Sequence, residues 1–249
     1  MTKNQPLISI IITYYRKKNY IKETLNSIIN QTYKNYELIL VYDDGIKDDL
    51  KYLKSLLTKF KKKKIIINKN NIGVAKSRNL AIKFCKGEYV AFIDSDDIWK
   101  KNKLKFQVNF MIKNLSIFSF TSYNVISHNG NFLSCRKVFV DADYKNLIES
   151  NFIGLSTVMV KKKIFKDIKF PNLKTQEDFA LWLKLIRKGH KLMHINKVLS
   201  CWRKSKNSLS SNKFQKLKDA FKLFNKYENK NFIFSIYSVL VLTYNKLNK

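Results

Sequence analysis

The sequence has few cysteines and no long apolar run. Its three cysteines are far apart, so they form neither a disulfide framework nor a pair with metal-ligand spacing. A reducing, cytoplasmic location is therefore expected. No run reaches the roughly 18 apolar residues of a membrane-spanning helix. The apolar run Leu7–Ile12 ends in Tyr14-Tyr15-Arg16 rather than in a small-residue cleavage site, which indicates a buried first strand and not a signal peptide.

Acidic residues and arginines are also scarce. The 18 acidic residues against 49 basic ones give a formal charge of +31, a balance that points to nucleic acid or an anionic membrane surface. Only five basic residues are arginines, although base and phosphate recognition favours the planar arginine fork. A lysine-rich composition is also typical of AT-rich codon drift. The charge thus favours an anionic bilayer over nucleic acid, since each lysine near such lipids contributes about 1 kcal/mol.

The first half of the chain alternates between strand and helix patterns. A chain of 249 residues with 45% hydrophobic content suits one large α/β domain. Apolar, β-rich runs at 7–14, 36–42, 64–68 and 88–93 are separated by helical patterns at 20–31, 48–63 and 74–85. This alternation predicts a mostly parallel central sheet, Rossmann-like, with helices on both faces and a ligand crevice at the carboxyl ends of its strands.

The second half is less regular. Asn129-Gly130 predicts a hairpin turn after the strand-like residues 116–127. A short helix is expected over 141–152, a strand over 157–160 and a helix over 176–189 that Gly189 ends. Residues 1–211 are expected to form the main domain. Residues 212–249 form a basic, amphipathic and apolar helical tail that contacts an anionic membrane, packs on the domain, or joins two subunits in a homodimer.

A cluster of carboxylates follows the strand that ends at Ile93. The segment Asp94-Ser95-Asp96-Asp97 places three acidic side chains within four residues. Like charges this close raise one another's pKa, so such a cluster normally needs a cation or ligand donors, and a divalent metal meets that need. The alternative is a solvated turn with an Asp-rich cap on a helix that begins at Ile98-Trp99.

Further segments complete a recognisable pattern. They are Ile8–Arg16, Ser27–Tyr33 followed by Val41–Gly45, Asn71–Asn79, Asp94–Asp97 and Glu177-Asp178. In this order and spacing, over residues 8 to about 210, they resemble a family 2 glycosyltransferase of the inverting type with a GT-A fold. The resemblance implies a GT-A catalytic domain over 1–211. It also implies transfer of a hexose-type sugar from a nucleotide-sugar donor, with a UDP-sugar preferred, to a glycan or lipid-linked acceptor in surface polysaccharide or lipooligosaccharide synthesis.

The resemblance also implies roles for the acidic residues. A bound Mn²⁺ or Mg²⁺ would stabilise the departing diphosphate. Asp96 is then the leading metal ligand, and Asp94 holds the ribose or shares the metal shell. Asp178 is the general base that takes the proton from the acceptor hydroxyl. The simpler interpretation of Glu177-Asp178 is a helix start with favourable dipole placement.

The remaining expected contacts lie around the donor. Asp43 or Asp44 contacts the nucleobase or ribose, and the pattern does not choose between them. Arg78 reaches a phosphate or the Asp94 cluster, or forms a structural salt bridge. Asp97 binds the donor sugar or caps the next helix. The other implied donor-site residues are Thr13, Tyr15, Arg16, Ser95, Glu177 and Arg203.

The chain departs from the family pattern in two loops. Ile46 and Lys47 stand where small hydroxyl residues are usual, and Ser205 stands where a histidine is frequent, so Arg203 or Lys206 is expected to supply positive charge. The three histidines lack mutual ligand spacing and are expected to be structural or on the surface. Two other classes stay open: an inactive GT-A module that binds a sugar nucleotide or glycan, and a basic membrane- or nucleic-acid-binding protein.

Overall fold

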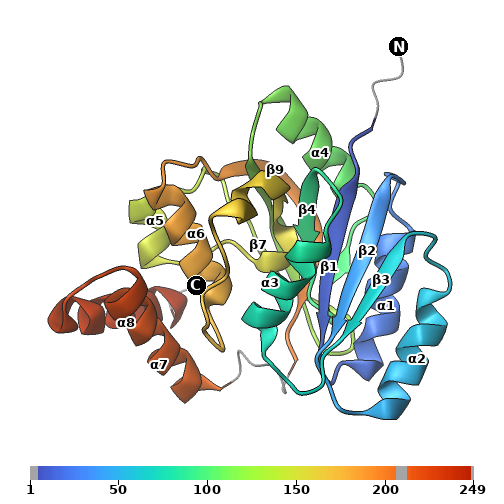
Figure 1. Ribbon diagram of the computed structural model, residues 1–249. Helices are drawn as coiled ribbons and strands as arrows, with labels where there is room; N and C mark the ends of the chain where they lie inside the picture. Colours follow the sequence, from blue (N-terminus) through green and yellow to red (C-terminus); the bar gives the residue numbers. More distant parts are fainter. Residues whose placement is uncertain (1–4, 206–211, 248–249) are drawn as a thin grey trace.

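The computed structural model describes residues 5–205 and 212–247 (Figure 1). Within them, nine strands form one sheet in the order β3-β2-β1-β4-β8-β6-β9-β5, with β7 paired to β6. The strands are β1 (Ile8–Tyr14), β2 (Tyr36–Tyr42), β3 (Lys63–Ile67), β4 (Tyr89–Phe92), β5 (Ile98–Trp99), β6 (Phe118–Ile126), β7 (Phe132–Arg136), β8 (Met159–Lys161) and β9 (Met193–Arg203).

The first four strands in the chain are parallel to one another, as predicted. Alternate residues of β1 face opposite cores: Ile10 and Ile12 belong to one apolar cluster, and Ile11 belongs to the other. The first cluster is covered by α1 (Lys18–Ile29), α2 (Lys47–Leu57) and α4 (Lys103–Lys113), and the second by α3 (Val74–Phe84) and α6 (Glu177–Arg187). The carboxyl ends of β1, β2 and β4 therefore open on one edge.

The α/β class with helices on both faces is confirmed, and the sheet becomes mixed in its second half. Strand β8 is antiparallel to both β4 and β6, whereas β9 runs parallel to β6. The expected hairpin is β6-β7, with Gly130 at φ 88° in its turn. The short helix α5 (Tyr144–Glu149) follows it, and 3₁₀ turns lie at Leu155–Thr157 and Lys162–Lys166.

The helix that we considered at Ile98-Trp99 does not form. These two residues make β5, which pairs with Ser200 and Cys201 of β9, and the indole N–H of buried Trp99 donates to the Ser156 carbonyl at 2.7 Å. Helix α4 begins only at Lys103, after Asn102. The interpretation of Asp97 as a helix cap is therefore wrong.

The C-terminal residues form two helices joined by a π-helical turn. They are α7 (Lys213–Lys222), the turn Leu223–Tyr227 and α8 (Phe232–Leu247). Leu223 and Phe224 are buried in the same core as α6, so the tail packs on the α5–α6 side of the molecule, away from β2 and β3 (Figure 1). Among residues 5–205 and 212–247, every helix is too short or too polar to cross a membrane.

Candidate active site

The acidic loop after β4 is held in place by its most buried carboxylate. Asp97 is 1% exposed, and it accepts hydrogen bonds from Ser156 Oγ at 2.6 Å and from the Arg203 backbone N–H at 2.9 Å. Burial raises the pKa of Asp97 well above its usual range, and the neighbouring carboxylates raise it further. These contacts make Asp97 a structural member of the loop, which fixes how Asp94 and Asp96 are presented.

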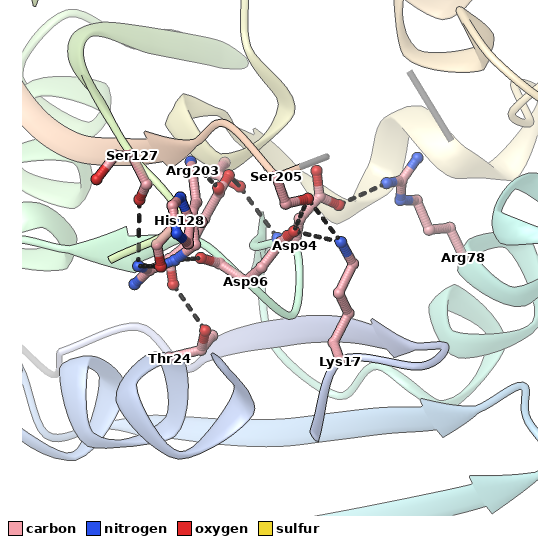
Figure 2. Close-up of polar contacts among 11 residues, drawn as sticks. Lys17, Thr24, Arg78, Asp94, Asp96, Ser127, His128, Arg203 and Ser205 are labelled. Atoms are coloured by element: carbon pink, nitrogen blue, oxygen red, sulfur yellow. Dashed lines mark hydrogen bonds and ion pairs between the residues drawn. The ribbon is translucent and has the colours of Figure 1, made fainter. Parts of the chain in front are cut away.

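Asp96 is paired with a cation that the sequence pattern did not single out. The Lys17 ammonium lies 2.7 Å from Asp96 Oδ2 and donates to Ser205 Oγ at 3.1 Å (Figure 2). Burial raises the pKa of Asp96, and Lys17 opposes that rise. Lys17 immediately follows the matched segment that ends at Arg16, so its position at the carboxyl end of β1 was the available signal.

Arg78 joins the acidic loop to the start of α6. Its guanidinium is buried, with Nη2 2.8 Å from Asp94 Oδ1 and Nη1 in contact with Glu177 Oε1. Figure 2 shows the side chain directed at Asp94. Burial raises the pKa of Glu177 to about 7, although Arg78 beside it acts in the opposite direction. Arg78 therefore reaches the Asp94 cluster, one of the contacts expected for it, and at the same time forms a salt bridge with Glu177.

Asp178 lies in the first turn of α6, next to Glu177. Its Oδ1 accepts from the Phe179 backbone N–H at 2.7 Å. The residue before the pair, Gln176, has a left-handed backbone with φ 63°. Burial raises the pKa of Asp178, whereas Arg78 lowers it. The residue as a whole is half-buried.

The two carboxylates after β2 have different surroundings. Asp43 accepts at Oδ1 from Asn68 Nδ2 at 2.7 Å, and the backbone N–H groups of Ile72 and Gly73 donate to its two oxygens at 2.9 Å. It therefore fixes the loop that enters α3. Within the described part of the chain, Asp44 accepts only from the backbone N–H groups of Arg16 and Gly45, both at 2.8 Å. Asp44 retains more acceptor capacity than Asp43.

The other expected donor-site residues differ in exposure. Thr13 is half-buried at the end of β1, Ser95 is buried, and Tyr15 and Arg16 are exposed, with the Arg16 guanidinium 5.2 Å from the Tyr15 ring centre. Arg16 has a positive φ of 51°, which marks the sharp turn out of β1. These residues surround the same edge as Asp44 and Lys17.

We expected Arg203 to contact the diphosphate, but in the structure its side chain binds protein groups. Its guanidinium is 2% exposed and donates to the carbonyls of Asp96 at 2.9 Å and His128 at 3.0 Å, and to Glu23 Oε2 at 2.5 Å. Arg203 and Arg78 lie on opposite sides of the acidic loop in Figure 2. Arg203 thus braces the loop from inside the protein. Lys206 lies outside the described residues.

The carboxylate oxygens of the acidic loop suit a hard divalent ion, but they would form only part of its coordination shell. Asp94 and Asp96 supply carboxylate oxygens of the kind that Mg²⁺ and Mn²⁺ prefer. Among the residues described here, no group of three His, Cys, Asp or Glu side chains is arranged to hold a metal by itself. A metal at this loop would therefore take further ligands from a bound molecule and water.

Comparisons with known proteins identify the family. The model of glycosyl transferase family 2 matches residues 9–169. A putative teichuronic acid biosynthesis glycosyltransferase of Bacillus subtilis is 34% identical over 94% of this chain and 93% of its own length. An Escherichia coli protein named UDP-Glc:alpha-D-GlcNAc-diphosphoundecaprenol beta-1,3-glucosyltransferase is 36% identical over 85% and 83% of the two chains.

A solved structure shows the same fold. The crystal structure of S. aureus TarS in complex with UDP-GlcNAc has a TM-score of 0.74 and 22% identity, and covers 93% of this chain and 70% of that one. The architecture is therefore that of the GT-A glycosyltransferases. The chain belongs to glycosyl transferase family 2, and the two relatives described above are both named as glycosyltransferases.

Proposed function

We propose that this protein is an inverting, metal-assisted hexosyltransferase that uses a nucleotide-sugar donor. The observation that carries the proposal is the Arg78 bridge, which joins Asp94 of the acidic loop to Glu177, the neighbour of Asp178. The predicted donor-binding carboxylate Asp94 is thereby tied to the start of α6, which also carries the predicted base. An enzyme of this type must fix these two groups relative to each other, because donor and acceptor react across a short distance.

In this proposal Asp178 takes the proton from the acceptor hydroxyl. The hydroxyl oxygen forms a bond to the anomeric carbon as the bond from that carbon to the diphosphate oxygen breaks, and the configuration inverts. The raised pKa of Asp178 favours its action as a base near neutral pH. Asp94 and Asp96 would hold Mn²⁺ or Mg²⁺ together with the diphosphate, and the cation when bound stabilises negative charge on the leaving group.

We propose that the nucleoside pocket lies at the sheet edge where β1 and β2 end. We assign its principal contact to Asp44, because the Asp43 carboxylate is already occupied by the 68–73 loop. Thr13, Tyr15 and Arg16 complete that side of the pocket. UDP is the preferred nucleotide, since the names of the E. coli relative and of the TarS complex both contain it.

The acceptor is proposed to be a glycan carried on a lipid, as the name of the E. coli relative states for that protein. The proposed catalytic domain, residues 1–211, would then act in the cytoplasm, at the inner face of the membrane. Surface polysaccharide or lipooligosaccharide synthesis is the corresponding process.

The test combines donor binding with turnover. Thermal shift is measured with UDP-, GDP- and dTDP-sugars in Mn²⁺, Mg²⁺ or EDTA, and nucleotide release is measured with added lipid-linked acceptor. We expect one donor to give a metal-dependent shift that Asp96→Ala abolishes. Asp178→Asn should keep the shift and lose turnover by at least about 10²-fold. The exposed Asp167→Asn serves as the matched control.

Two outcomes would contradict the proposal. Loss of donor binding in Asp178→Asn would remove its assignment as the base. A donor-dependent shift without nucleotide release from any acceptor would favour the inactive sugar-nucleotide-binding module.

A further inference from the structure

Helix α8 has an apolar face turned away from the protein. From Phe232 to Asn245 the sequence contains no Asp, Glu, Lys or Arg. Six large side chains on one broad stripe are more than two-fifths exposed, among them Ile233 at 76% and Leu240 at 62%. The others on that stripe are Phe232, Ile236, Tyr237 and Tyr244. An exposed apolar surface of this extent marks an interaction site in a folded protein.

The opposite face of α8 fixes the helix to the protein. Ser235 is fully buried, and Val239 and Leu242 pack against the core that contains α6. Asn245 Nδ2 donates to the Glu149 carbonyl of α5 at 3.0 Å. The inner face therefore has its partners already, and the outer stripe is presented on a fixed support.

The stripe continues onto α7. Phe214 and Leu217 are exposed at 79% and 45%, and Phe221 follows them on the same helical face. The Phe221 ring meets the Phe232 ring edge-on at 5.4 Å, which joins the two helices into one apolar surface. Figure 1 shows both helices at the margin of the molecule, beyond α5 and α6.

Charge indicates what covers this surface. The exposed lysines of α7 and the turn after it are Lys213, Lys218, Lys222 and Lys226. A second copy docked symmetrically on the stripe would bring two such sets together in a chain that already has a formal charge of +31. An anionic bilayer offers apolar depth to the stripe and opposite charge to the lysines.

We infer that the outer faces of α7 and α8 form a docking surface for an anionic lipid bilayer, in which α8 lies in the interface without crossing the membrane. Tyrosine side chains suit the headgroup level, because they combine an apolar ring with a polar tip. Phenylalanine side chains suit the apolar face of an interfacial helix. Binding by this surface requires neither donor nor acceptor, so it can be tested independently of the proposed glycosyl transfer.

The experiment is sedimentation of the full chain with vesicles of phosphatidylglycerol and phosphatidylcholine in equal parts, compared with phosphatidylcholine alone. We expect strong binding only to the anionic vesicles. The triple variant Ile233→Gln, Tyr237→Gln, Leu240→Gln should reduce partitioning by at least about tenfold, because each substitution removes an apolar side chain from the stripe. A control variant, Phe132→Gln, Leu133→Gln, Phe139→Gln, changes three similarly exposed apolar residues elsewhere and should bind as wild type.

Thermal melting of each variant shows that it is folded. A second arm replaces Lys213, Lys218 and Lys222 by Gln and should weaken binding most at low salt. Unchanged partitioning of the α8 variant, or equal binding to both vesicle types, would overturn the inference. So would a dimer, seen by light scattering in wild type, that the α8 substitutions dissociate while vesicle binding persists.

Discussion

The Lys17 ammonium and the Asp96 carboxylate form an ion pair of 2.7 Å at the centre of the candidate site. Both groups are largely shielded from water, with side-chain exposures of 16% and 11%. Lys17 thus neutralises the carboxylate that we assign to the metal, and Ser205 hydrogen-bonds to both groups. A metal that binds Asp96 must compete with this internal cation.

Replacing Lys17 by Met should therefore strengthen metal binding in the absence of donor. We expect the Kd for Mn²⁺, measured by titration calorimetry, to fall roughly tenfold, which corresponds to about 1.4 kcal/mol. Lys18→Met is the matched control, because Lys18 pairs with Asp49 and not with the acidic loop. A weaker Mn²⁺ affinity in Lys17→Met would show that Lys17 supports the metal site instead of competing with it.

Helix α7 contributes to the site through Asp219. This buried carboxylate accepts from the Thr175 backbone N–H at 2.9 Å and from Thr175 Oγ1 at 3.0 Å. Thr175 lies two residues before Glu177. Asp219→Ala leaves these donors unsatisfied, at a cost of about 1 to 3 kcal/mol. We expect turnover to fall while donor affinity is nearly unchanged, because α6 carries the proposed base.

The measurement for Asp219 is kcat alongside donor Kd and the melting temperature. Asp219→Asn, which keeps an acceptor oxygen, should restore much of the turnover. If Asp219→Ala lowers the melting temperature but keeps full kcat, the contact is structural only.

The parallel half of the sheet was predictable because its information is local. Alternating apolar strands and amphipathic helices specify β1 to β4 and the sheet edge on which Asp44 and Asp94 both lie. The strand at Ile98-Trp99 was not predictable from the sequence, because β5 exists only through its pairing with β9, about a hundred residues away. A strand of two residues has no periodicity to detect.

The same distinction applies to the site. Motif spacing predicted roles for Asp94, Asp96 and Asp178, but the cations that pair with Asp94 and Asp96 come from remote segments. Arg203 carries a charge that the pattern associates with the diphosphate, yet it satisfies the Asp96 and His128 carbonyls inside the loop. Residue type predicted the charge, whereas the direction of the side chain depended on tertiary packing.

The buried acidic groups should make stability fall as pH rises through the acidic range. Burial raises the pKa of Glu177 from 4.5 to about 7, so between these values the folded state binds a proton that the unfolded state has released. This contribution to stability is complete below about pH 4.5 and is lost as pH rises through 7. Asp96, Asp97 and Asp178, whose pKa values are also raised, act with the same sign.

Urea unfolding at a series of pH values tests this dependence. The slope of unfolding free energy between pH 4.5 and 7 should be shallower in Glu177→Gln than in wild type, because one titrating group is removed. Arg78 loses a partner in this variant, so the comparison rests on the slope and not on the absolute stability. Identical slopes would place the titration in another group.

Lys103 is a buried lysine whose ammonium is costly to the fold. Its Nζ has no hydrogen-bond partner among the described residues and lies 4.0 Å from the centre of the Trp99 ring. Burial lowers its pKa well below the usual value of 10.5, so folding near neutral pH requires either loss of the proton or burial of an unpaired charge. Lys103→Met keeps an unbranched side chain that is one heavy atom shorter and removes that cost, and we expect it to stabilise the protein by about 1 to 3 kcal/mol. The exposed Lys105→Met on the same helix should change the unfolding free energy by less than about 0.5 kcal/mol. A lower melting temperature in Lys103→Met than in Lys105→Met would mean that the contact with Trp99 outweighs the desolvation of the ammonium.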